Sequence, residues 1–536
     1  MAERRQPVIP AWLWPGLSAA AFLLTVALAA MGALGFNAPA PHWRAILTDA
    51  YLWHVLRFTF WQAFLSAALS VLPAILLARA LYRRRFPGRR LLLRFCAMTL
   101  VMPVLVAVFG ILGVYGRQGW LAQVSAALHL PYHFSPYGLC GILLAHVFFN
   151  LPLATRLLLQ ALESIPIEQR QLAAQLNMVG WDMFRLLEWP WLRRQLTPAA
   201  ALIFMLCFAS FATVLALGGG PRATTIELAV FQALSYDYDP GRAAFLALLQ
   251  MACCLGLVLL GQRLARALPA GDTQALPWRN PGDRGRGRII DGIVIILALL
   301  FLLPPMLSVA VGGINRDLPA ALAQPALWTA MLTSVKIALG AGLLCLLLTT
   351  MLLWSGREFR LRRRYWPAQL LDLSGMVILA MPGIVIATGF FLLANESVGL
   401  PQSPYGLVII TNALMAIPYT LKILESPMLD LAERYSRLCL SLGIRGHNRL
   451  RLVEWRALRQ PLARAMAFAS ILSIGDFGVV ALFGNAQFRT LPYYLYQQIG
   501  AYRSQDGAVS ALALLLLCFA LFTLIEKLAG PHDPPR

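Results

Sequence analysis

Long apolar stretches, separated by short polar and basic segments, run along almost the whole chain. Because about 20 apolar residues make one membrane crossing, we predict twelve membrane-spanning helices. Six of them lie in the first half of the chain, at about 12–35, 54–80, 91–115, 137–159, 198–217 and 243–264. The other six lie at about 289–311, 330–353, 370–393, 405–424, 463–483 and 508–528. The pattern predicts an all-α integral membrane protein with two halves of six helices each.

The polar segment from Ser164 to Leu196 recurs in altered form 266 positions later, from Asp430 to Leu462. In this register Leu176, Arg185, Glu188, Trp189, Leu192, Arg193 and Leu196 correspond to Leu442, Arg451, Glu454, Trp455, Leu458, Arg459 and Leu462. A repeat at half the chain length indicates two copies of one membrane unit. We therefore predict homologous halves at 1–264 and 289–536, joined by a Pro-, Gly- and Arg-containing cytoplasmic linker at 265–288.

Composition and charge agree with a protein of the lipid bilayer. The 536 residues are 59% apolar and 13% charged, with a mean hydropathy of +0.67, whereas about a quarter of the residues in soluble proteins are charged. The net charge of +21 comes from arginines that gather in alternate loops between the apolar stretches. By the positive-inside rule this places both termini and the two repeated segments in the cytoplasm of a cell with an inner membrane. We predict no nucleic-acid partner.

No pattern of catalytic or metal-binding residues stands out. The eight cysteines lie mostly inside apolar stretches, without a C-x-x-C pair, and the seven histidines are scattered. Such cysteines are typical of buried packing positions rather than of a disulfide or zinc framework. The sequence therefore predicts a protein without a metal site and without enzymatic chemistry of its own.

Each repeated segment is predicted to contain a short helix, a stop and a second helix that leads into the next span. Pro166 begins the short helix of the first copy, and Ser426 is the expected N-cap in the second copy, with Pro427 in the first turn. The stops are expected at Asn177 and Gly443, because these residue types most easily adopt the left-handed backbone that ends a helix. A short helix held between two spans is suited to press into a partner protein.

The repeated segments resemble the cytoplasmic EAA loop of ABC importer permeases, whose pattern is E-A-A-x-x-x-G. In the first copy Gln171, Leu172, Ala173 and Asn177 occupy the E, A, A and G positions, and Trp181, Phe184 and Pro190 follow at the family's spacing. In the second copy Arg437, Leu438, Cys439 and Gly443 occupy these positions, and Arg456 stands where the family has proline. The resemblance implies an ABC type I importer permease-like fold whose two loops couple to a cytoplasmic ATPase by helix-in-groove docking.

Other segments, among them GRQGWLA (116–122), NLPLATRLLLQALESIP (150–166) and SIGDFGVVALFGN (473–485), look like those of thiamine ABC transporter permeases. This resemblance covers essentially the whole chain. It implies import of thiamine and its phosphates, with two copies of a cytoplasmic ABC ATPase subunit and a periplasmic thiamine-binding protein as partners. None of the three lysines lies in a G-x-x-x-x-G-K-[ST] loop, so no cofactor is expected in this chain, and ATP and Mg²⁺ are expected on the ATPase subunits.

One acidic residue falls in the middle of a predicted span. Asp476 lies in the fifth span of the second half, and Ser210 is its counterpart in the first half. Thiamine carries a permanent positive charge, which a carboxylate with aromatic neighbours such as Phe211 and Phe477 would stabilise in transit. The alternatives are that Asp476 pairs with Lys336 or caps a broken helix.

Two other transport functions remain open from the sequence, and a polytopic membrane enzyme is a third possibility that the lack of a catalytic constellation disfavours. One is a fused ABC permease for another solute, such as ferric iron or a polyamine. The other is an ion-coupled secondary transporter, which can also have six-plus-six repeats. A secondary transporter is expected to carry a relay of intramembrane acids, for which Asp476 alone is weak support.

Overall fold

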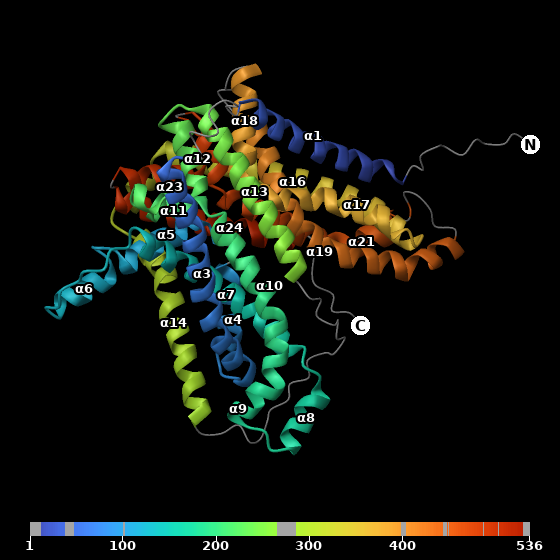
Figure 1. Cartoon of the computed structure of the whole chain (residues 1–536), viewed down its shortest axis with the longest axis horizontal. Coiled ribbons are helices and arrows are strands. Elements are labelled where there is room, and N and C mark those ends of the chain that lie inside the picture. Colours follow the sequence, from blue (N-terminus) through green and yellow to red (C-terminus); the bar gives the residue numbers. More distant parts are fainter. Residues whose placement is uncertain are drawn as a thin grey trace, which may run out of the picture. The chain divides into compact units, whose positions relative to one another are not determined.

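The computed structural model of the chain describes residues 12–37, 48–99, 102–264, 286–397, 404–442, 448, 450–485, 487–501 and 503–528. Every regular element in these residues is a helix, which confirms the predicted all-α class (Figure 1). The chain forms two compact units. We call them the N-terminal unit, made of His42–Ala229 and Cys253–Asn315, and the C-terminal unit, made of Met1–Pro41, Val230–Ala252 and Arg316–Arg536.

The N-terminal unit is built around three long helices that pack on one another, α3, α7 and α10. Its elements are α3 (Ala50–Arg83), α4 (Arg89–Thr99), α5 (Val104–Tyr115), α6 (Trp120–Ala127), α7 (Leu139–Glu163), α8 (Ile167–Gln175), α9 (Gly180–Asp182), the π-helix η2 (Met183–Glu188), α10 (Trp189–Phe208), α11 (Phe211–Leu217), η3 (Pro221–Ala223) and α14 (Arg286–Gly313). Figure 1 shows α6 extending away from the rest of this unit, while α8 and α9 lie where α7 ends and α10 begins.

The C-terminal unit has the same central arrangement, with α16, α19 and α21 packed on one another. Its elements are α1 (Trp14–Asn37), α15 (Leu318–Leu322), α16 (Pro325–Leu361), α17 (Tyr365–Met376), η4 (Val377–Ala380), α18 (Gly383–Ser397), α19 (Tyr405–Ser441), the π-helix η5 (Leu450–Glu454), α21 (Trp455–Gly475), α22 (Gly478–Phe483), α23 (Leu491–Gly500) and α24 (Ser504–Leu528). The unit boundaries pass through α12 (Ile226–Ser235) and α13 (Pro240–Leu264).

The first helix of each sequence half is exchanged between the units. Helix α1 packs against α16, α17 and α18 of the C-terminal unit, and α14 packs against α3 and α5 of the N-terminal unit. The buried face of α1 includes Ala19, Leu23, Ala27 and Ala30, a spacing of three or four residues that forms one helical stripe. Each unit therefore contains residues from both sequence halves. The predicted division at 264 and 289 describes the sequence repeat and not the two compact units.

Small residues allow the exchanged helices to approach their neighbours closely. A Cβ atom added to Gly389 of α18 would lie 2.5 Å from the carbonyl oxygen of Ala30 in α1. In the N-terminal unit a Cβ atom on Gly110 of α5 would collide with the carbonyl oxygen of Pro305 in α14. These two glycines lie 279 positions apart. Each lies at a helix–helix contact that is too close for a residue with a side chain.

The third and fifth predicted spans of both halves are interrupted at matching places. The third spans break before Pro103 and Pro382, where a residue without an N–H group ends the preceding helix. The fifth spans break at Ser210, between α10 and α11, and at Asp476, between α21 and α22. Helices α10 and α11 meet at an angle of 56°.

Because of these breaks, fewer helices in the described part of the chain are long enough to cross a membrane than the twelve spans that the sequence predicts. The described residues contain nine helices long and apolar enough to cross a membrane, or ten when the bent pair of α10 and α11 counts as one span. The predicted spans at 370–393 and 463–483 coincide with α17–α18 and α21–α22, which are interrupted. The number twelve stays a prediction. The predicted linker lies outside the described residues, except for residues 286–288, which begin α14.

Candidate functional site

The first repeated segment forms the helix–stop–helix structure that the sequence predicts. Helix α8 begins directly after Pro166. It ends where Asn177 adopts a left-handed backbone with φ of 53°. The N–H groups of Met178 and Asn177 donate to the carbonyl oxygens of Ala173 and Ala174, each at 2.9 Å. This is the Schellman pattern of a helix end, and it shows that asparagine serves here where the family pattern has glycine.

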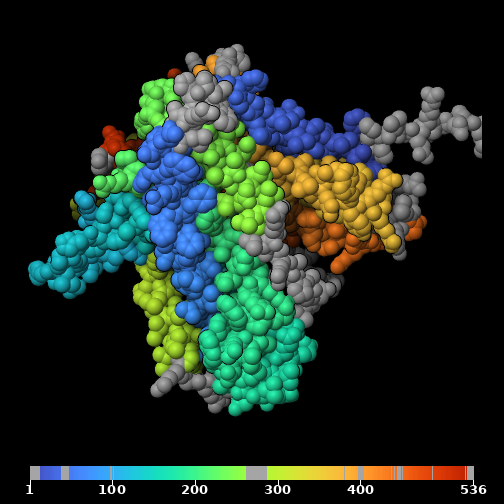
Figure 2. Space-filling view, viewed as in Figure 1, coloured from blue at the N-terminus to red at the C-terminus, as the bar shows by residue number. Residues whose placement is uncertain are grey.

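An apolar surface faces outward from this segment. The exposed fractions are 56% for Leu172, 65% for Leu176, 68% for Trp181 and 63% for Leu186, whereas Ala173 is only 3% exposed. Figure 2 shows the segment as a projection at one end of the N-terminal unit. Large exposed apolar side chains gathered in one short segment mark an interaction surface.

The remaining predicted residues of the first segment lie around this surface. Gln171 and Asn177 are exposed on α8 and at its end. The ring of Phe184 packs between the rings of Trp181 and Trp189, with centroid distances of 5.4 and 5.8 Å. Pro190 is the second residue of α10 and follows the π-helix η2 directly.

The buried arginine of α8 fastens the short helix to the unit. The guanidinium of Arg170, whose residue is 6% exposed, donates to the carbonyl oxygen of Glu163 at 3.0 Å. It also lies over the ring of Tyr82 in the last turn of α3, 5.1 Å from the centroid. The contact satisfies a carbonyl at the end of α7, where helix carbonyls lack partners within the helix. Helix α8 is thereby held to both α3 and α7.

The second repeated segment is built differently, and the expected helix start at Ser426 is wrong. Helix α19 runs without interruption from Tyr405 to Ser441, with Pro427 in its interior. The Ser426 hydroxyl donates to the carboxylate of Asp430 at 3.2 Å instead of capping a helix. In this copy the preceding span and the short helix therefore form one continuous helix. Its expected stop at Gly443 lies outside the described residues.

Positions of the two segments that lie 266 residues apart share the same environment. Leu438 is 49% exposed and Leu442 63% exposed, like Leu172 and Leu176, and Cys439 is 3% exposed, like Ala173. The side chain of Arg437 lies outside the described part of the structure. Both segments therefore present leucines outward from the same register and bury the second alanine position of the motif. We call these segments the two coupling elements, after the role that the resemblance implies. The first consists of α8 and the residues that follow it up to Glu188, and the second consists of the end of α19 and η5.

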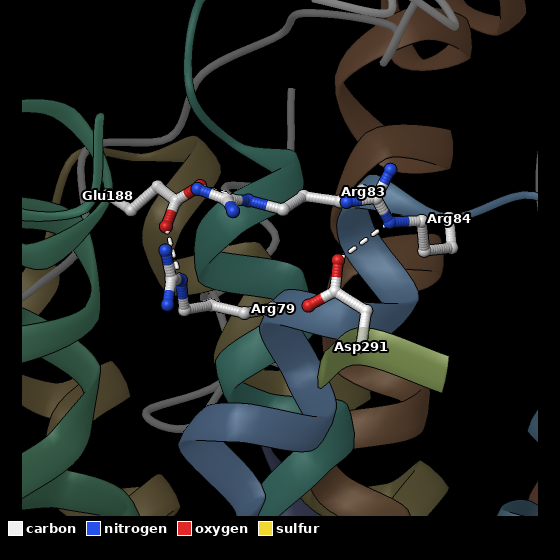
Figure 3. A network of polar contacts seen from close by, with 5 residues as sticks. All are labelled: Arg79, Arg83, Arg84, Glu188 and Asp291. Atoms are coloured by element: carbon white, nitrogen blue, oxygen red, sulfur yellow. Dashed lines mark hydrogen bonds and ion pairs between the residues drawn. The ribbon is translucent and has the colours of Figure 1, made fainter. Parts of the chain in front are cut away.

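Both coupling elements contain a glutamate of the repeat to which the sequence interpretation assigned no role. Glu188 and Glu454 end the π-helices η2 and η5, and both are buried, at 0% and 2% exposed. Figure 3 shows Glu188 between Arg79 and Arg83 of α3. A signal was present in the sequence, because glutamate recurs at this position in both copies. A π-helix is rare and often marks a functional position.

Ser210, one of the two predicted substrate-path residues of the first half, belongs to a polar chain that is largely buried. The hydroxyl of Ser210, at the break of the fifth span, lies 2.7 Å from Nε2 of His146 in α7. Nδ1 of His146 lies 2.9 Å from the hydroxyl of Ser66 in α3. Phe211 follows directly and is 6% exposed. The chain ties the break in the fifth span to α3 and α7, a role that the sequence interpretation missed for His146.

In the second half Asp476 caps a helix. Its carboxylate accepts a hydrogen bond of 3.3 Å from the N–H group of Val479 in the first turn of α22, which is one of the predicted alternatives. The adjacent Phe477 is 2% exposed. Its ring lies 4.9 Å from that of Tyr496 and 6.3 Å from that of Tyr493, both in α23. An acidic group and three aromatic rings are thus gathered at the break of this span.

Comparisons with known proteins agree with this architecture. Residues 353–528 match the family described as binding-protein-dependent transport system inner membrane component. The chain is 70% identical over 532 residues to the thiamine transport system permease protein ThiP of Salmonella typhimurium, covering 99% of both proteins. It is 44% identical over 515 residues to the protein of the same name from Brucella abortus, covering 96% of this chain and 94% of that protein. A probable sulfate transport system permease protein of Marchantia polymorpha is 26% identical over 184 residues.

Proposed function

Because the chain belongs to the family of thiamine transport system permease proteins, we propose that it forms the membrane passage of an ATP-driven importer for thiamine and its phosphates. The similarity to relatives named for thiamine transport covers nearly the whole chain, and this observation carries the choice of substrate. The chain is a multi-pass inner-membrane transport component, and the proposal adds the substrate, the partners and the direction of transport.

The proposed motor is a pair of cytoplasmic ABC ATPase subunits, one docked on each coupling element. The outward-facing leucines of both elements occupy the same register, and an apolar helix face that enters a groove is a common mode of docking. ATP and Mg²⁺ would be held by the ATPase subunits, because this chain has no G-x-x-x-x-G-K-[ST] loop. A periplasmic thiamine-binding protein would deliver substrate to the opposite face.

The proposed orientation places both termini and both coupling elements in the cytoplasm, following the distribution of arginines. The proposed mechanism is alternating access. ATP closes the ATPase dimer and draws the coupling elements together, and the spans then open toward the periplasm. In the C-terminal unit the uninterrupted α19 would carry this movement directly into the membrane. In the N-terminal unit α8 would carry it through its contacts with α3 and α7.

The two coupling elements are proposed to dock alike but to differ in their tolerance of mutation. Leu172→Glu and Leu438→Glu place a charge on equivalent exposed positions and should each weaken binding of the ATPase in a pull-down with purified subunits. Leu121→Glu, on the exposed face of α6, is the matched control and should leave binding unchanged. ATP-coupled thiamine uptake should fall to different degrees in the Leu172→Glu and Leu438→Glu variants. Equal loss of uptake in these two variants would contradict the proposed difference in tolerance of mutation.

Asp476 with Phe477, and Ser210 with Phe211, are proposed to line the path of the cationic substrate. The aromatic rings around Phe477 support this role, because ring faces attract cations. Asp476→Asn keeps the size of the side chain and its ability to accept the hydrogen bond from Val479. The expected result is slower thiamine uptake with an unchanged assembled complex. Uptake equal to that of the unmodified protein would remove Asp476 from the path.

The whole proposal is tested by reconstituting the chain with the ATPase and the binding protein in liposomes and measuring uptake of labelled thiamine. We expect uptake with ATP and none with an ion gradient alone. Thiamine monophosphate and diphosphate should compete with thiamine, whereas ferric iron and polyamines should not. Uptake driven by the gradient without ATP would overturn the ATP-driven mechanism.

A further inference from the structure

Buried ion pairs connect the C-terminal ends of the two coupling elements, where η2 and η5 end, to long helices of the same unit. In the N-terminal unit Oε2 of Glu188 lies 2.6 Å from Nε of Arg79, and Oε1 lies 2.8 Å from Nη2 of Arg83. The side chain of Glu188 is 0% exposed, and those of the arginines are 20% and 11% exposed. One carboxylate therefore receives two guanidinium groups in an environment with little water.

The spacing of these arginines explains the geometry. Arg79 and Arg83 are four residues apart and so lie on the same face of α3, one turn above the other. The glutamate ends the π-helix η2, whose wider turn shifts the residues that follow by about 100° relative to an uninterrupted α-helix. The π-helix thus contributes to the direction in which Glu188 projects, and Figure 3 shows it pointing between the two arginines.

The last turns of α3 also hold two other elements. Arg84, at the end of α3, forms an ion pair of 2.6 Å with Asp291 of α14 (Figure 3). Tyr82 lies beneath Arg170 of α8. The end of α3 therefore contacts three elements: α8 at the start of the coupling element, Glu188 at its end, and the exchanged helix α14.

The C-terminal unit repeats the arrangement. Nη2 of Arg357 in α16 lies 2.8 Å from Oε1 of Glu454, and the two side chains are 2% and 3% exposed. The Arg357 guanidinium also lies 3.9 Å from the ring centroid of Trp354. One turn further on, Arg360 pairs with Asp372 of α17 and Glu425 of α19, at 2.5 and 2.8 Å. Helix α16 thus occupies the place in this unit that α3 occupies in the other.

We infer that Glu188 and Glu454 are positioning residues that make α3 and α16 move together with the coupling elements. Separating a buried carboxylate from a buried guanidinium leaves both charges without compensation, which is far more costly than deforming an exposed contact. A pull on η2 or η5 is therefore passed to α3 or α16 instead of being absorbed in the loop. This inference rests on the proposed ATP-driven function, since it assigns the route by which the motor's movement enters the membrane.

The test uses the reconstituted complex and measures ATP hydrolysed per thiamine imported. We expect Glu188→Gln and Glu454→Gln each to raise this ratio tenfold or more, because hydrolysis continues while its movement is no longer transmitted. Arg79→Gln should change the ratio less than threefold, because Arg83 still holds the carboxylate. Glu163→Gln is the matched control: Glu163 also meets an arginine, Arg89 at 3.4 Å, but is 43% exposed, so the ratio should stay the same.

A role in folding alone is distinguished by the same ratio. If the glutamates only stabilise the fold, the Gln variants give less complex, but the complex recovered hydrolyses the usual amount of ATP per thiamine, and the inference is overturned. If a Gln variant yields no complex, Glu188→Asp or Glu454→Asp keeps the charge and withdraws the carboxylate by one methylene, and the same criterion applies. The charge exchange Arg357→Glu with Glu454→Arg should return the ratio to within threefold of the unmodified complex. Absence of ATP-driven uptake by the unmodified complex would instead contradict the proposed function.

Discussion

Replacing Gly389 with alanine tests the close packing of the exchanged helix α1 against α18. The added Cβ would lie 2.5 Å from the carbonyl oxygen of Ala30, 2.8 Å from its Cα and 2.9 Å from its carbonyl carbon. Ordinary contact begins at 3.4 Å, so the α1 backbone must retreat by 3.4 minus 2.5, or 0.9 Å. Because all three atoms belong to the backbone, no side chain can rotate away to relieve the clash.

The expected loss of stability follows from two opposing effects. Overpacking in a well-packed interior costs up to about 3 kcal/mol, and a clash with backbone belongs at the upper end. The higher helix propensity of alanine returns about 1 kcal/mol. Gly389→Ala should therefore destabilise the C-terminal unit by about 2 kcal/mol, seen as a lower midpoint of thermal unfolding for the protein purified in detergent.

A second glycine provides the control. Gly256 lies within α13, and an added Cβ meets no atom within 4 Å, so Gly256→Ala should leave the midpoint unchanged or raise it slightly. Gly110→Ala, which meets the carbonyl oxygen of Pro305, should lower the midpoint as Gly389→Ala does. Identical midpoints for the Gly389 and Gly256 variants would refute the close approach of α1 and α18.

Three further predictions concern the helix stop, the buried polar chain and the orientation. Asn177→Ala should lower stability by about 1 kcal/mol, because alanine tolerates the left-handed backbone poorly, whereas Asn177→Gly should not; thermal unfolding measures the difference. Ser66→Ala should cost about 1–3 kcal/mol in the same assay, because it leaves a ring nitrogen of buried His146 without this hydrogen bond. Cys140 is exposed at the start of α7 and should react with a membrane-impermeant maleimide added to the periplasmic face. Labelling only from the cytoplasmic face would contradict the proposed orientation.

Some features of the fold could be predicted from local sequence alone. Helical class follows from the length and apolarity of the stretches. The stop at Asn177 follows from the backbone preference of one residue type. The start expected at Ser426 failed because proline is also tolerated inside a long helix when neighbouring helices support it. Ser426 and Pro427 are compatible both with a helix start and with the interior of a longer helix. Local preference does not decide between the two when tertiary packing favours the longer helix.

Other features depend on contacts between distant residues and left little trace in any one segment. The exchange of α1 and α14 depends on glycines that meet backbone far away in the sequence, such as Gly389 and Ala30. The ion pair of Arg357 with Glu454 joins residues 97 positions apart. The recurrence of glutamate in both copies of the repeat was the one available signal for it. In a chain with 45 basic residues, no single arginine identifies itself as the partner.

The exchanged first helices impose an order on the synthesis of the protein. Helix α1 leaves the ribosome well before its partners α16, α17 and α18, which begin only at Pro325. At about 5–20 residues per second, that delay of roughly 300 residues lasts about 15–60 s. The N-terminal unit is likewise incomplete until α14 has been made. Neither unit can therefore finish folding before the ribosome has entered the second half, and a nascent chain cut within the linker would expose the faces of α3 and α5 that α14 covers.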